Sequence, residues 1–74
     1  MDRESFLTEF VSLLGAEPSE IALQTELASL TRWDSIALML YMALVEEKFG
    51  HVIKPDDIAA AKTVEDLYQL ASRS

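Results

Sequence analysis

The chain has 74 residues, of which 50% are hydrophobic, and its 13 acidic and 6 basic residues give a net charge of −7. This length and composition predict one small folded domain spanning residues 1–74, with too little core for the deep pocket of an autonomous enzyme. The acidity disfavours nucleic-acid binding, which depends on basic groups, and the absence of cysteine excludes disulfides, thiolate metal sites and cysteine nucleophiles.

The first predicted element is a helix from about Arg3 to Leu14. Its apolar residues recur at the spacing of a single helical face: Phe6, Phe10, Leu13 and Leu14. Leu7 and Val11 widen this stripe. Gly15 follows directly, and glycine commonly ends a helix at this position.

Residues 15–34 are predicted to form a long loop, with a short helical turn near Ser19–Ile21. Its large apolar residues are scattered, and we expect them to pin the loop to the core: Ile21, Leu23, Leu27 and Leu30. The loop is long enough to return the chain to the start of the first helix. We therefore expect the second helix to lie parallel to the first or to cross it steeply.

A second helix is predicted from Ser35 to about Phe49, with Asp34 or Ser35 as its cap and Gly50 as its terminator. The middle of this helix is apolar nearly all round. Such a pattern indicates either full burial or an exposed apolar face.

Two shorter helical segments complete the chain. Pro55 begins a short third helix with Asp56 and Asp57 in its first turn. Thr63 and Asp66 have the spacing of a capping box, which predicts the start of a last helix. Its inward residues follow helical spacing: Val64, Leu67, Tyr68 and Ala71. No segment has a strand pattern, so the predicted fold is an all-α four-helix bundle with three longer helices and a short third one.

The tripeptide Asp34-Ser35-Ile36, at the start of the second of four predicted helices, resembles the Asp-Ser-Leu motif of the acyl carrier protein family. The resemblance covers nearly the whole chain. Its other matching positions are Met42-Ala43-Leu44, Glu46-Glu47, Phe49, Ile53, Pro55-Asp56 and Thr63-Val64.

The resemblance implies that Ser35 is the attachment point of 4′-phosphopantetheine, donated from coenzyme A by a magnesium-dependent phosphopantetheinyl transferase. The arm's terminal thiol then holds an acyl or aminoacyl group as a thioester, so the protein needs no cysteine of its own. A helix N-terminus suits the phosphodiester of such an arm, because its dipole and free N–H groups favour anions. By the same resemblance Asp34 caps the helix and presents a charge to the transferase, and Ile36 fills an apolar contact.

The second helix departs from the family's fatty-acid-synthesis members, in which acidic residues on this helix meet basic patches of partner enzymes. Here only Glu46 and Glu47 remain. Three apolar residues are predicted to lie on its outward face: Ala37, Leu40 and Leu44. The alternative that Leu40 and Leu44 are simply core residues stays open. The predicted partner-recognition set is Asp34, Ile36, Ala37, Leu40, Leu44 and Glu47.

Trp33 precedes the Asp-Ser pair, and this arrangement resembles free-standing bacterial carriers that dedicated ligases load with acyl or aminoacyl groups. We therefore expect a specialised carrier with a loading ligase and a downstream transferase as partners. Two roles are open for Trp33, flanking the arm or packing the loop onto the second helix, and the large area that a tryptophan buries favours packing. We expect a soluble, cytoplasmic monomer, because no apolar run is long enough to span a membrane and the start of the chain is unlike a signal peptide.

The remaining candidates have structural explanations. His51 is predicted to be exposed, and the acidic pairs Glu46-Glu47 and Asp56-Asp57 to be solvated helix ends rather than a metal site. Three residues of the second helix are interpreted as core: Met39, Tyr41 and Met42. A second hypothesis is an unmodified helical module that binds a partner helix or itself through the second helix. An enzyme is the least favoured reading, because no nucleophile–base pair or phosphate-binding loop is present.

Overall fold

The computed structural model describes residues 1–73 and contains four α-helices. The elements in chain order are α1 (Arg3–Leu14), the 3-10 turns η1 (Pro18–Glu20) and η2 (Leu27–Ser29), α2 (Ser35–Phe49), α3 (Pro55–Ala59) and α4 (Val64–Ser72). Within residues 1–73 there is no strand, and one isolated antiparallel bridge pairs Glu26 with Thr63. The predicted all-α bundle with a short third helix is confirmed. No helix in these residues is long and apolar enough to cross a bilayer.

Local signals set the helix ends. Both longer N-terminal helices stop at glycines in the left-handed backbone region, Gly15 with φ +66° and Gly50 with φ +77°. A residue with a β-carbon is disfavoured in that conformation. The predicted capping box of α4 is confirmed, because Thr63 Oγ1 accepts the N–H of Asp66 and the Asp66 carboxylate accepts the N–H of Thr63, both at 3.2 Å.

An aromatic cluster forms the centre of the bundle. Phe6 of α1 is fully buried. Its ring centroid lies 6.0 Å from Phe10, 6.3 Å from Tyr41, 6.3 Å from Phe49 and 5.6 Å from Tyr68. One side chain therefore contacts rings from α1, α2 and α4, and these contacts hold the three longer helices together.

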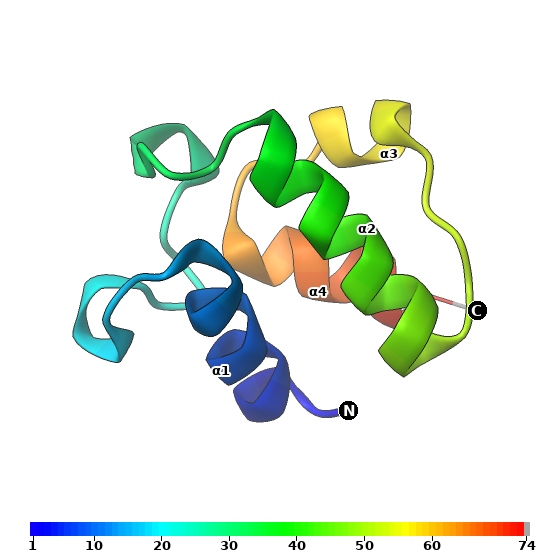
Figure 1. Ribbon diagram of the computed structural model, residues 1–74, viewed down its shortest axis with the longest axis horizontal. Coiled ribbons are helices and arrows are strands. Elements are labelled where there is room, and N and C mark those ends of the chain that lie inside the picture. Colours follow the sequence, from blue (N-terminus) through cyan, green and yellow to red (C-terminus); the bar gives the residue numbers. More distant parts are fainter. Residues whose placement is uncertain (74) are drawn as a thin grey trace.

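The helix α2 runs antiparallel to α1, as Figure 1 shows. Phe6 near the start of α1 lies against Phe49 at the end of α2. At the opposite end, the Arg32 guanidinium donates to the carbonyl oxygens of Leu14 and Gly15, so the end of the loop returns to the end of α1, where the loop began. The predicted parallel or steeply crossed arrangement is wrong, because the loop does not travel along α1.

The long loop instead covers the start of α4. The carbonyl oxygens of Leu23 and Thr25 accept the N–H groups of Glu65 and Val64 at 2.9 and 3.2 Å. These bonds satisfy two donors that a helix start leaves free. Ile21 is buried, and Leu27, Leu23 and Leu30 lie against the core, so the predicted pinning is confirmed, as is the short turn, which forms at η1.

The buried face of α2 consists of residues four apart: Ala37, Tyr41 and Val45. The prediction that Ala37 faces outward is wrong, since only 4% of it is exposed. The core assignment of Met39 is also wrong, since 67% of it is exposed, whereas Tyr41 is fully buried and Met42 is partly buried. In a helix that is apolar all round, only the position of α1 and α4 decides which side is inward.

The helix α4 places Val64, Leu67 and Ala71 in the core as predicted, with Tyr68 partly buried. His51 does not lie free in solvent, so the prediction of its exposure is wrong. Its Nε2 atom is hydrogen-bonded to the carbonyl oxygen of Ala71, which draws the segment after α2 onto the last turn of α4.

Candidate functional site

Ser35 is the first residue of α2, and its side chain is exposed. The cap of the helix is Asp34, whose carboxylate accepts the N–H of Ala37 at 2.9 Å. The sequence allowed either residue as the cap, and the structure assigns that role to Asp34. The hydroxyl of Ser35 is thus left at the surface.

The surroundings of Ser35 favour an anion. The first N–H groups of a helix have no carbonyl partner within it, and Asp34 takes up only that of Ala37. The first turn of α2 contains no acidic residue. A negatively charged group at Ser35 would lie at the positive end of a 15-residue helix dipole, next to the N–H groups of the first helical turn.

The site lacks a group that could activate this hydroxyl. The chain's one histidine, His51, is bonded to Ala71 beyond the far end of α2. The Asp34 carboxylate is engaged as a cap. Neither His51 nor the Asp34 carboxylate is therefore placed to activate the Ser35 hydroxyl as a nucleophile.

Trp33 anchors the chain just before Ser35. Its ring centroid lies 5.6 Å from Phe10 of α1 and 6.1 Å from Tyr41 of α2. The predicted packing role of Trp33 is confirmed. Behind it, the hydroxyl of Tyr41 donates to the carbonyl oxygen of Leu67 at 2.6 Å, and burial raises the pKa of Tyr41.

Arg32 is a positioning residue that sequence reasoning missed. Its guanidinium caps the carbonyl end of α1 through Leu14 and Gly15, which is favourable for a cation at a helix C-terminus. The sequence shows a basic residue in the loop before α2. Its partners, the carbonyl oxygens at the end of α1, cannot be identified until the structure shows that the loop returns to that helix end. Arg32 and Trp33 together fix the backbone that presents Ser35.

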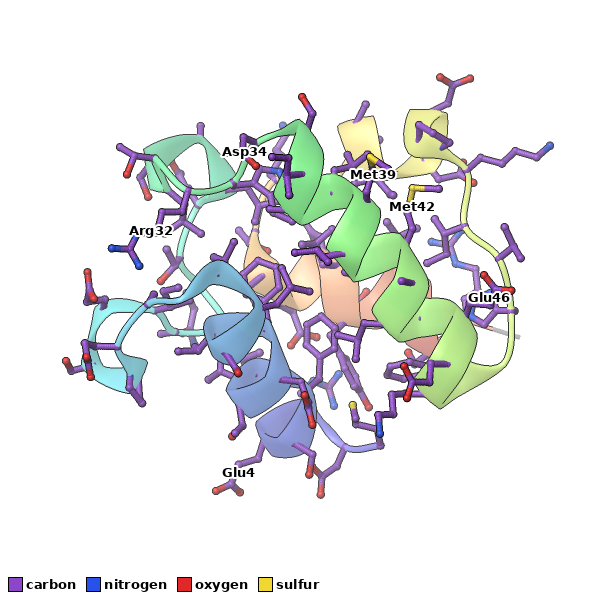
Figure 2. The ribbon with its side chains drawn as sticks, in the orientation of Figure 1. Glu4, Arg32, Asp34, Met39, Met42 and Glu46 are labelled. Atoms are coloured by element: carbon purple, nitrogen blue, oxygen red, sulfur yellow. The ribbon has the colours of Figure 1, made fainter. Side chains whose placement is uncertain are left out.

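The predicted partner-recognition residues differ in exposure. Ile36 is 69% exposed, so the predicted apolar contact is not made within the chain. Leu40 is 48% exposed, Leu44 is partly buried against the core, and Glu47 is exposed. Leu40 is therefore an exposed residue, as the outward-facing prediction required, whereas Leu44 packs against the core, as the alternative required. Figure 2 shows Met39, Met42 and Glu46 along the other side of α2, toward α3.

A groove runs between α1 and α2. It consists of a cavity of about 310 Å³ at the head of α2 and a second of about 440 Å³ farther along, and both are lined by Leu13 and Leu40. All the predicted partner-recognition residues line this groove: Asp34, Ile36, Ala37, Leu40, Leu44 and Glu47. The structure thus brings that set together beside Ser35, with the buried Ala37 at the floor.

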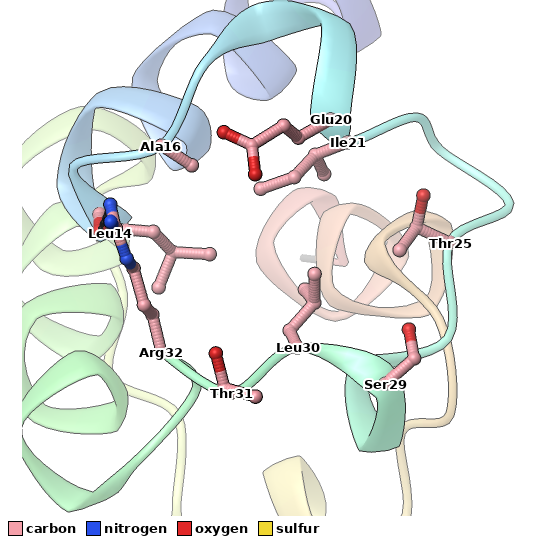
Figure 3. Close-up of a pocket in the computed structure, with 9 residues that line it drawn as sticks. All are labelled: Leu14, Ala16, Glu20, Ile21, Thr25, Ser29, Leu30, Thr31 and Arg32. Carbon is pink, nitrogen blue, oxygen red and sulfur yellow. Dashed lines mark hydrogen bonds between the residues drawn. The ribbon is translucent and has the colours of Figure 1, made fainter.

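Another cavity, of about 230 Å³, lies under the loop (Figure 3). Three of its polar side chains are hydrogen-bonded to the loop backbone. Glu20 accepts the N–H of Glu17, Thr25 accepts the N–H of Ala22, and Ser29 donates to a carbonyl oxygen. These groups stabilise the turns of the loop. Within residues 1–73 no three His, Asp or Glu side chains gather in a way that could hold a metal ion.

Comparison with known protein families matches residues 4–71 to the family described as the phosphopantetheine attachment site. No curated protein and no solved structure matches the chain. Domains of this family carry 4′-phosphopantetheine covalently on a serine, are non-catalytic carriers, and interact with a phosphopantetheinyl transferase and with partner enzymes. The match spans nearly all of the four helices and includes the head of α2.

Proposed function

The chain belongs to the phosphopantetheine attachment-site family, and on that premise we propose that Ser35 carries the arm and that the protein holds an acyl or aminoacyl group on it as a thioester. The observation that carries this proposal is the exposed side chain of Ser35 at the head of α2. Because Asp34 caps the helix, the Ser35 hydroxyl is not needed as the cap. The arm supplies the thiol that a chain without cysteine lacks.

Ser35 suits the arm better than Ser5 and Ser29, two other serines of the matched region. Ser5 also lies in the first turn of a helix, but that turn contains the acidic residue Glu4, which repels a phosphate. Ser29 donates its hydroxyl to the carbonyl oxygen of Glu26. Ser35 alone among these combines exposure with an uncharged first helical turn.

The residues around Ser35 hold the phosphodiester end of the arm. The backbone donors at the start of α2 face the phosphate, and the cap at Asp34 keeps the helix start formed. Arg32 and Trp33 restrain the preceding loop. A magnesium-dependent transferase donates the arm from coenzyme A. The Ser35 hydroxyl loses its proton and bonds to the phosphorus of 4′-phosphopantetheine, the pyrophosphate bond of coenzyme A breaks, and adenosine 3′,5′-bisphosphate leaves.

The test is an intact-mass measurement. The apo protein is incubated with coenzyme A, magnesium and a broad-specificity phosphopantetheinyl transferase, and we expect a mass gain of one phosphopantetheine. Ser35→Ala abolishes the gain, while the matched variant Ser5→Ala retains it. Absence of any gain in the wild type, or a gain that survives Ser35→Ala, rules out the proposal.

We further propose a specialised carrier rather than a fatty-acid-synthesis one. No acidic residue lies between Ser35 and Glu46, and Ile36 and Leu40 are exposed there. This surface fits partners with apolar contact sites, namely a loading ligase and a downstream transferase. On this proposal the protein is a cytoplasmic, bacterial, single-domain monomer without catalytic activity of its own. If the ligase loads the holo protein at a rate that hardly changes with salt concentration, the result supports docking through apolar contacts. A rate that falls steeply with added salt contradicts it.

The alternative is an unmodified interaction module, which the exposed Ile36, Met39 and Leu40 of α2 favour. In that case Ser35→Ala is harmless, whereas Leu40→Asp abolishes self-association or partner binding. Gel filtration separates the two: a monomer that Leu40→Asp leaves unchanged removes the support for self-association.

A further inference from the structure

The groove beside Ser35 has one wall that belongs to α1. Glu9, Ser12 and Leu13 line it from this side. Glu9 and Leu13 are four residues apart, so they lie one above the other on one face of the helix. The groove is therefore a composite of two antiparallel helices.

The chemical character changes along the groove. At the head of α2 it is bordered by Ile36 and Leu40, both largely exposed. Farther along, Glu9 on α1 and Glu47 on α2 line opposite walls, with Lys48 beside them. Neither carboxylate takes part in the ion pair formed within residues 1–73, which joins Arg3 to Glu65. These three charges leave a net negative charge at that end.

We propose that the phosphopantetheinyl transferase docks in this composite groove, with an apolar side chain between Leu13 and Leu40 and a Lys or Arg side chain between Glu9 and Glu47. This inference rests on the proposed function, because the transferase has to cover the head of α2 in order to reach Ser35. Asp34 and Ile36 flank Ser35 and also line the groove, so an enzyme that covers Ser35 also covers its opening.

The dimensions and the charge agree with such a partner segment. Glu47 lies eleven positions after Ile36, which is about 16 Å at the helical rise of 1.5 Å per residue. That length accommodates three turns of a helix or five residues of an extended strand. The carboxylates and the overall charge of −7 attract a basic segment and repel an acidic one.

The test compares two charge reversals on α1. Glu9→Lys changes the groove, and Glu4→Lys changes an exposed residue of the same helix that lies away from it (Figure 2). The rates of modification by the transferase are measured as a function of carrier concentration. We expect Glu9→Lys to raise KM roughly three- to tenfold with kcat unchanged, and Glu4→Lys to leave both near the wild-type values. Added salt raises the wild-type KM more than that of Glu9→Lys.

A second variant tests the apolar half of the groove. Leu40→Gln removes the contact with a side chain that is 48% exposed and so keeps the fold, which circular dichroism verifies. It too is expected to raise KM without changing kcat.

The outcomes distinguish the two proposals. A wild-type protein that gains no mass refutes the proposed function and this inference with it. A wild-type protein that is modified, with the same KM for Glu9→Lys and Glu4→Lys, refutes only the docking groove. A dimer that Glu9→Lys dissociates, with KM unchanged, assigns the groove to a second copy of the chain and also overturns the inference.

Discussion

Replacing Trp33 by alanine tests whether the packing of one ring holds the proposed modification site, Ser35, in place. Trp33 contacts Phe10 at 5.6 Å and Tyr41 at 6.1 Å between centroids, and both of those rings are fully buried. Removing a core tryptophan costs about 3–5 kcal/mol. Trp33 is only partly buried, so we expect Trp33→Ala to lose about 3 kcal/mol, at the lower end of that range.

That loss is large for a domain of this size. Each kcal/mol shifts the melting temperature by about 4–8 °C in domains of 60–100 residues, so the expected decrease is about 12–24 °C. Circular dichroism is the suitable probe, because the variant removes the chain's one tryptophan and its fluorescence. Trp33→Phe keeps an aromatic ring between α1 and α2, and it is expected to lose about 1 kcal/mol.

The same variant has a functional readout. A loosened loop presents Ser35 in more than one orientation, so modification of Trp33→Ala is expected to be slower even at a temperature where the variant is folded. A loss in stability below about 1 kcal/mol for Trp33→Ala would refute the role of this ring as the anchor. Normal modification kinetics in the folded variant would refute its role in presenting Ser35.

Three further predictions concern the ends of the helices. The N–H groups of Lys62 and Thr63 lower the pKa of Asp66 below its ordinary value of 3.8. The stability that this carboxylate contributes is therefore present above pH 3.8 and is lost as the pH falls through the lower pKa of the folded state, and acid titration by circular dichroism should show this loss reduced in Asp66→Asn. Gly50→Ala should lower the free energy of unfolding, measured by urea denaturation, by about 1 kcal/mol, because alanine is strained at a φ of +77° even though no atom lies within 4 Å of the added carbon. Gly50→Asn should lower it less, because asparagine tolerates this conformation better. Arg32→Gln should lower stability by about 1 kcal/mol and raise the KM of modification, whereas the exposed Lys54→Gln should do neither; equal effects of the two variants would argue against the capping of α1 by Arg32.

The helix ends could be predicted from the sequence because their signals are local. Gly15 and Gly50 each terminate a helix through their own backbone conformation, and Thr63 caps one through residues in its own first turn. Such signals act within four residues and need no knowledge of the rest of the fold. The position of Ser35 at the head of α2 could be predicted for the same reason.

The remaining features depend on contacts between distant segments. The inward face of α2 could not be identified from its pattern, because apolar residues occur all round it, so Ala37 and Met39 were both assigned to the wrong side. The direction of α2 depends on the bond from Arg32 to the end of α1, and the burial of His51 depends on Ala71 of α4. Neither pair is close in sequence, and neither has a periodicity that would reveal it.

The acidic residues of the chain are distributed so that few of them lie near the anionic phosphate proposed at Ser35. Along α2 the first acidic residue after Ser35 is Glu46, eleven positions on, which is about 16 Å at 1.5 Å per residue. The Debye length is about 8 Å at physiological ionic strength, so Glu46 and Glu47 hardly repel a phosphodiester at Ser35. Asp34 is close, but its carboxylate is compensated by the N–H of Ala37 at the positive end of the helix. The head of α2 is therefore suited to the phosphate that we propose at Ser35, while the carboxylates at the far end of the groove remain available to a basic partner at contact distance.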